Sequence, residues 1–199
     1  ARRVSYFSSS GHSLGVVKRR DDFRVDTSVT TGSAKLSDYY KSGFDRGHLA
    51  PAHDFSWSGS ALSETFLMSN MSPQTASFNR GIWLSLENKV RDITAMGNEL
   101  VIVVGPIVEE TDSTIGESKV KVPSRFFKAF IARSNTSPQA PWQGVGYVLK
   151  NSSEKQSLES AIVSIDSIEE ITGLDLFGAL DDSIESQVEQ KTTRNWGAI

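Results

Sequence analysis

The chain lacks cysteine and has only three histidines among its 199 residues. Without cysteine it cannot form disulfides, and any zinc site would need ligands other than thiolates. No apolar run approaches the roughly 20 residues that a membrane-spanning helix needs. The missing thiols fit an oxidising compartment, in which a stray cysteine is a liability. We therefore expect no membrane association and a secreted or periplasmic location.

The chain also has no excess of positive charge: its formal net charge is −3 at pH 7. This charge argues against a protein that binds nucleic acid through a broadly basic surface. It does not exclude a local basic groove, since counterion release depends only on the charges at the contact. Acidic residues concentrate between positions 154 and 189, whereas many arginines lie in the first half. Any basic face is therefore expected in the first half.

The length of the chain fits one domain, spanning residues 1–199, with a core of its own. The apolar run at residues 100–106, closed by Gly105 and Pro106, predicts a buried central strand. Three shorter apolar runs predict further strands of the same sheet, at residues 66–70, 126–132 and 144–149.

Helices are predicted at three places. Apolar residues recur at helical spacing over residues 79–95. A second helix is expected to begin with a capping box at Asp166 and to end at Gly173, and a third covers residues 181–190. The order of strands, helix, strands and helices predicts an α+β fold, with a mostly antiparallel central sheet flanked by helices.

One short segment stands out chemically, Asp45-Arg46-Gly47-His48. A single histidine is more often structural than catalytic, but the residues beside His48 favour a catalytic role. Gly47 permits a backbone geometry that other residues resist, Asp45 can orient an imidazole, and Arg46 can bind an anion. The alternative is a surface turn with an Asp45–Arg46 ion pair, which leaves His48 unexplained. We favour a catalytic turn.

A second polar group lies along the helix predicted for residues 79–95. Asn79 is either the N-cap of this helix or a metal ligand through its amide oxygen. Glu87 and Arg91, four residues apart, form either an exposed ion pair or a carboxylate that holds a metal-bound water and is tied down by the arginine. Magnesium suits the second interpretation, because it keeps several waters and takes few protein oxygens. The spacing alone leaves both choices open.

These segments together resemble a known family, the sugar-non-specific DNA/RNA endonucleases of the Serratia-nuclease and endonuclease G type. The resemblance implies a ββα-metal nuclease fold. It also admits a mitochondrial location as the alternative to secretion. The family usually carries a longer segment with an extra strand before this stretch, so we expect the N-terminal edge to differ. The matching motifs occur in order along the chain, at residues 45–51, 66–74, 79–87, 104–106, 122–128 and 163–174.

The resemblance implies specific roles for the motif residues. His48 would be the general base, and Asn79 the direct ligand of one Mg²⁺, for which Mn²⁺ could substitute. Glu87 would anchor metal-bound water. Asp45 would belong to the catalytic group, and Asn70 would support the site. The substrate phosphate would be bound by Arg46, by Arg91 and by either Arg19 or Arg20, which cannot be separated from the sequence.

The resemblance further implies DNA and RNA as substrates, and it admits a homodimer and a protein inhibitor as partners. A non-catalytic nucleic-acid-binding module on the same fold is the alternative. Such a module would need only the arginines, so the presence of His48, Asn79 and Glu87 argues for an enzyme.

Overall fold

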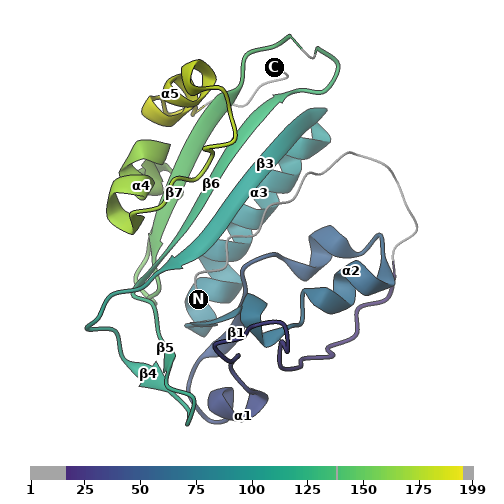
Figure 1. The fold of residues 1–199 in the computed structure, drawn as a ribbon, viewed down its shortest axis with the longest axis vertical. Helices are drawn as coiled ribbons and strands as arrows, with labels where there is room; N and C mark the ends of the chain where they lie inside the picture. The colour runs from purple at the N-terminus through teal and green to yellow at the C-terminus, as the bar shows by residue number, and fades with distance from the viewer. Residues whose placement is uncertain (1–16, 138, 195–199) are drawn as a thin grey trace.

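A four-stranded antiparallel sheet forms the centre of the computed structural model, which describes residues 17–137 and 139–194. The strand order is β3–β6–β7–β8. Figure 1 shows the three long strands side by side, with helices on both faces. The strands are β3 (Asn98–Ile107), β6 (Arg125–Ser134), β7 (Gln143–Lys150) and β8 (Ile162–Val163).

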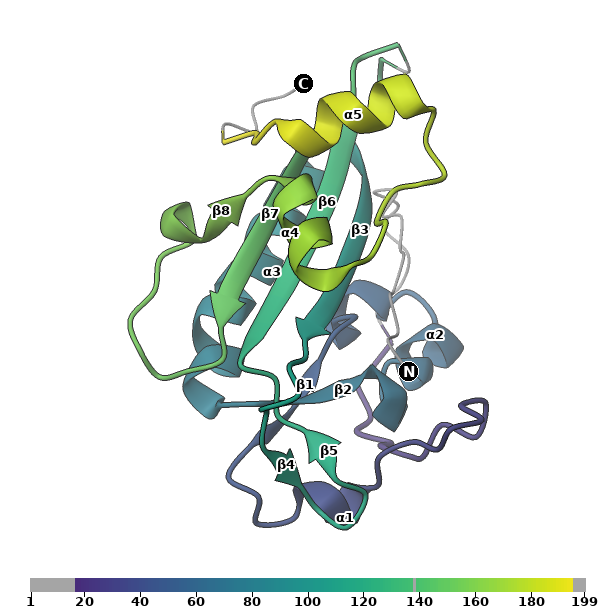
Figure 2. The ribbon, with the colours of Figure 1, turned by 60° about the vertical axis from the view of Figure 1, so that its left-hand side comes forward.

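Each face of this sheet is covered by different helices, because both sets of alternating side chains in the strands are apolar. On one face, Leu100, Ile102 and Val104 of β3 pack with the long helix α3 (Leu84–Ala95). On the other face, Val103 of β3 and Phe127 and Ile131 of β6 pack with α4 (Ile165–Thr172) and α5 (Asp182–Gln190). Figure 2 shows α4 and α5 lying across the sheet.

A separate two-stranded ribbon leads into the long helix. Strand β1 (Asp45–His48) pairs antiparallel with β2 (Met71–Gln74), so that His48 lies opposite Met71. The chain then enters η3 (Phe78–Trp83), a wide turn of π type, and continues into α3. Two strands followed by a helix form the ββα unit. The α+β class and the antiparallel sheet are therefore confirmed.

Short elements complete the fold around this unit. None of the helices in the described part of the chain is long and apolar enough to cross a membrane. The remaining elements are α1 (Leu36–Tyr39), η1 (Ala52–Phe55), α2 (Gly59–Glu64), η2 (Met68–Asn70), β4 (Thr114–Ile115), β5 (Val120–Lys121) and η4 (Glu159–Ala161).

Three local predictions were wrong. Residues 66–70 form no strand, because η2 turns the chain there and β2 begins only at Met71. The helix predicted from residue 79 is interrupted at Gly81, whose φ and ψ of −111° and −107° are not helical. Helix α4 is capped by Ser164, whose side chain accepts from the Ser167 amide, and not by a capping box at Asp166. The predicted end at Gly173 is confirmed by its left-handed φ of 65°.

Gly47 has a different role from the one expected. Its φ is not positive, so no special backbone conformation requires glycine. Instead, the fully buried side chain of Gln74 from the paired strand lies directly against it, where any Cβ would overlap the Gln74 amide. The absence of a side chain lets the two strands of the ribbon close over Gln74.

Replacing Gly47 by alanine should therefore destabilise the ribbon by overpacking, at a cost of about 1–3 kcal/mol. Urea unfolding followed by circular dichroism measures the loss. Gly59→Ala is the matched control, because a Cβ there meets only Val17 Cγ1 at 3.9 Å. Equal stability of the Gly47 and Gly59 variants would contradict the explanation.

Candidate active site

A cavity of about 650 Å³ opens where the β1–β2 ribbon meets the start of α3. His48, Asn79 and Glu87 all line it, and so do Arg19 and Arg46. Asp45 and Arg91 are part of its wall as well. Seven of the nine residues predicted from sequence thus converge on one cavity, although they come from four separate segments.

Two phenylalanines shape the environment of His48. Its ring lies edge-on to Phe66, with centroids 5.0 Å apart, and 6.0 Å from the ring of Phe23. The buried Nε2 has no hydrogen-bond partner among the described residues. Burial, together with the positive charge of Arg19, lowers the pKa of His48 to about 4. The imidazole is therefore neutral at physiological pH, as a general base must be.

The same two rings contact the guanidinium groups of two arginines that line the cavity. The guanidinium of Arg46 lies over Phe23, 4.3 Å from the ring centroid, and that of Arg19 lies over Phe66 at 5.1 Å. Arg19 also pairs with Asp21 at 2.7 Å. Both guanidinium groups are thus placed beside His48 by cation–π contacts. Arg20 is exposed and does not line the cavity, so the structure separates the two arginines that the sequence could not.

Asp45 does not orient the imidazole, contrary to the expectation. Its Oδ2 accepts hydrogen bonds from Asn79 Nδ2 and Arg80 Nε, both at 2.9 Å, and its Oδ1 accepts from Arg80 Nη2 at 2.8 Å. Burial opposes ionisation of Asp45, but the bonds from Arg80 and Asn79 outweigh it and lower the pKa of the carboxyl. Asp45 is therefore an anchor for the beginning of the helix.

Asn79 is not the N-cap of the helix, because it lies inside η3. A carboxylate can only accept, so the bond to Asp45 fixes which end of the Asn79 amide is the nitrogen. The amide oxygen has no hydrogen-bond partner among the residues that the structure describes. An oriented, unpaired amide oxygen at a cavity wall is a suitable ligand for a hard cation.

Glu87 and Arg91 belong to a partly buried chain of alternating charges. Arg91 contacts Asp54 at 2.5 Å and Glu87 at 3.4 Å. The Glu87 side chain is only 11% exposed. Burial raises the pKa of the Glu87 carboxyl, while the positive charges of Lys128 and Arg91 oppose that rise. The exposed ion pair that the spacing also allowed is excluded by this burial.

Lys128 was missed as part of this charge chain. It is 2% exposed, and its ammonium lies 4.8 Å from the ring centroid of Trp83, which precedes Glu87 by one helical turn. Burial lowers the pKa of Lys128, and Glu87 is the largest influence that raises it. A lysine inside an otherwise apolar strand was the available signal. Phe23, Phe66 and Asp54 gave no such signal.

Asn70 lies outside the cavity and supports it from behind. Its side chain is 5% exposed, accepts from the Ala50 amide and donates to the Ala50 and Thr65 carbonyls, at 2.9 to 3.0 Å. These three bonds fix the segment that follows His48. The position agrees with a supporting role.

Comparison with known proteins assigns the family. The family model for DNA/RNA non-specific endonucleases matches residues 3–183. A nuclease from Nostoc sp. is 33% identical over 191 residues, covering 89% of this chain and 67% of that protein. Human mitochondrial endonuclease G is 36% identical over 170 residues, covering 79% of this chain and 56% of that protein. The chain spans about half to two thirds of the length of such relatives.

A solved structure gives the same answer. The complex of EndoG with EndoGI, described as showing the mechanism of EndoG inhibition, matches with a TM-score of 0.81 and 26% identity. The match covers 94% of this chain and 80% of that one. Fold and sequence together define the fold of the ββα-type nucleases. The chain belongs to the DNA/RNA non-specific endonuclease family.

The lowered pKa of His48 generates a prediction for its titration. The ring-proton resonance of His48, assigned by comparison with His48→Ala, should titrate in NMR spectra near pH 4. The pKa of histidine in an unfolded chain is about 6.5, so between about pH 6.5 and pH 4 His48 binds a proton in the unfolded state but not in the folded state. The stability contributed by neutral His48 should thus be lost as the pH falls from about 6.5 to 4. A midpoint near 6.5 would disprove the effect of burial.

The two neighbouring arginines generate another prediction. Arg19→Ala should slow cleavage of duplex DNA and reduce the log–log salt dependence of binding by about 0.9, the value for one phosphate contact. Arg20→Ala is the matched control and should leave both near wild type. Binding to a duplex across a salt series measures the slope. A larger effect of Arg20→Ala would show that the wrong arginine has been placed at the phosphate.

Proposed function

We propose that this protein is a Mg²⁺-dependent endonuclease that hydrolyses phosphodiester bonds in both DNA and RNA, with Mn²⁺ able to replace Mg²⁺. The observation that carries the proposal is the shared cavity. A neutral imidazole and an oriented amide oxygen face it, beneath arginines that are suited to phosphate. These groups match the three requirements of hydrolysis, namely a base, a cation ligand and an anchor for the anionic substrate.

His48 would take the proton from the attacking water. We assign this step to Nδ1, because Nε2 is buried. Phe66 and Phe23 keep the ring in place and keep it neutral. A bound Mg²⁺ would supply charge stabilisation for the phosphoryl group and the leaving oxygen. Asn79 would ligate this ion through its amide oxygen, and Glu87 would accept hydrogen bonds from the hydration shell.

The arginines account for the breadth of substrate. Arg19 and Arg46 would bind phosphate oxygens, which are the same in every sequence and in both DNA and RNA. The guanidinium of Arg91 donates hydrogen bonds to Asp54, Asn88 and Glu87, so we propose that its main role is to position Glu87. We infer that the enzyme acts with little preference for base sequence and leaves a 5′ phosphate.

The proposals for partners and location are supported by the names of the relatives. Endonuclease G from human and EXOG from mouse are both named as mitochondrial. These names support a mitochondrial location over a secreted one for this protein. The solved complex of EndoG with EndoGI supports a protein inhibitor as a partner. A homodimer remains a proposal that rests on the family resemblance alone.

The experiment is a plasmid-nicking assay with Mg²⁺ and with EDTA. Wild type should nick in Mg²⁺ and stop in EDTA, and His48→Ala should lose about 10²–10⁴-fold in rate while retaining DNA binding. His53→Ala is the matched control, since His53 lines the same cavity but has no such aromatic contacts. A binding module without activity would show no nicking in wild type.

A second variant tests the ion ligand in the same assay. Asn79→Ala should require a higher Mg²⁺ concentration for half-maximal rate, because one neutral oxygen is the expected direct protein ligand. An unchanged Mg²⁺ activation curve would refute the assignment of Asn79. Full activity of His48→Ala would refute the general base, whatever the metal curve shows.

A further inference from the structure

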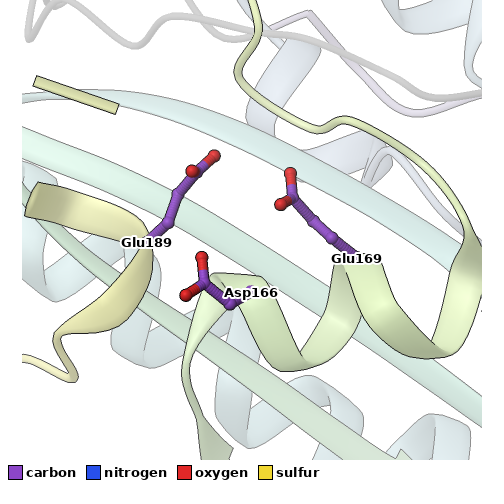
Figure 3. A group of neighbouring side chains, drawn as sticks. All are labelled: Asp166, Glu169 and Glu189. Atoms are coloured by element: carbon purple, nitrogen blue, oxygen red, sulfur yellow. The ribbon is translucent and has the colours of Figure 1, made fainter. Parts of the chain in front are cut away.

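Three carboxylates gather on the side of the molecule away from the catalytic cavity. Asp166 and Glu169 come from α4, one turn apart, and Glu189 comes from the last turn of α5. Their nearest oxygens all lie within 4.8 Å of one another. Figure 3 shows the three groups pointing toward a common space between the two helices. The central sheet separates this group, the α4–α5 acidic cluster, from His48 and Asn79.

Glu189 is the unusual member of the α4–α5 acidic cluster. The residue is only 8% exposed, and its Oε1 is buried without a hydrogen-bond partner among the described residues. A buried carboxylate without a donor or a positive partner is costly. The strongest charges acting on Glu189 belong to other acids, Glu169 and Glu185 first. Burial and these charges raise the pKa of Glu189 to about 7.

Close packing fixes the position of α5 on the sheet. Gly144 of β7 lies so close to α5 that a Cβ there would overlap the Val188 carbonyl and approach Ile165 Cδ1 to 2.9 Å. The Thr193 amide donates to the Gly144 carbonyl at 3.0 Å, just beyond the end of α5. Val188 packs into the core on this face of the sheet. Packing therefore holds Glu189 beside the two acids of α4.

We propose that the α4–α5 acidic cluster is a binding site for a calcium-class divalent cation, separate from the catalytic metal. Three carboxylates and no nitrogen ligand form a donor set for a hard cation. Calcium tolerates irregular coordination and bonds to oxygen at about 2.3–2.6 Å, which suits three carboxylates that come from two helices. Magnesium, at about 2.1 Å, would demand a tighter and more regular arrangement.

The cation would join α5 to α4. It would supply a positive partner for Glu189, which has none among the described residues, and it would convert mutual repulsion into a bridge between two helices. The Leu176 amide already holds Glu169 Oε1 at 2.7 Å, which leaves Oε2 for the ion. Because the site lies behind the sheet, its occupancy should affect thermal stability and leave the catalytic groups in place.

Thermal unfolding at pH 8, where Glu189 is ionised, tests the site in the full chain. Saturating Ca²⁺, at 100 times its dissociation constant, should raise the melting temperature of the wild type by roughly 5–10 °C above the value in EDTA. Mg²⁺ at the same concentration should have a much smaller effect. Glu189→Gln should abolish the calcium shift, yet melt higher than wild type in EDTA because one repelling charge is gone.

Two controls separate this site from other effects of the ion. Glu170→Gln removes an exposed acid of α4 outside the cluster and should keep the full calcium shift. Asn79→Ala removes the proposed catalytic ligand and should keep it too, so failure here is independent of failure of the nuclease assignment. A calcium shift that survives in Glu189→Gln would overturn the proposal. The proposal would also be overturned if the melting temperature of the wild type rose at lower pH but not with Ca²⁺. That result would mean that a proton on Glu189, and not a bound ion, relieves the repulsion.

Discussion

The hydrogen bonds of Asp45 join the ribbon to the helix, and the geometry of the cavity depends on them. The ion pair with Arg80 is largely exposed on the arginine side, so its energy is small. The bond to Asn79 matters for direction, since it turns the amide nitrogen toward the carboxylate and leaves the oxygen unpaired. A side chain of β1 thus determines which atom the beginning of the helix presents to the cavity.

The aromatic pair and the charge chain solve two opposite problems in the same cavity. Phe23 and Phe66 exclude water from His48 and so keep it neutral, while still supporting two positive arginines on their faces. On the other wall, Glu87 is only 11% exposed, and the role proposed for it beside a cation needs its charged form. Lys128 and Arg91 supply the positive charges that oppose its protonation. Burial favours the neutral form of both groups, and only at Glu87 do neighbouring positive charges oppose it.

The sequence predicted the elements with strong periodicity and missed those decided by tertiary contacts. The apolar run at residues 100–106 was correctly predicted as a buried strand, whereas the shorter run at 66–70 leads into a 3-10 turn at Met68–Asn70. The residue types at His48 and Asn79 were visible, but the partner of Asp45 was not, because β1 and η3 are brought together only by folding. Lys128 could be noticed in its apolar strand, but its closeness to Trp83 and the choice of Arg19 over Arg20 required the three-dimensional structure.

The alternation of side chains along β6 limits which insertions and deletions this protein can tolerate. Lys128 points toward α3, while its neighbours Phe127 and Ala129 point toward α4 and α5. Side chains alternate along a strand, so inserting or deleting one residue would exchange the two sets. The lysine would then face the acidic helices, and a phenylalanine would lie beneath Glu87. Evolution can therefore exchange residues within this strand, but it cannot alter the length of the strand without disrupting both faces at once.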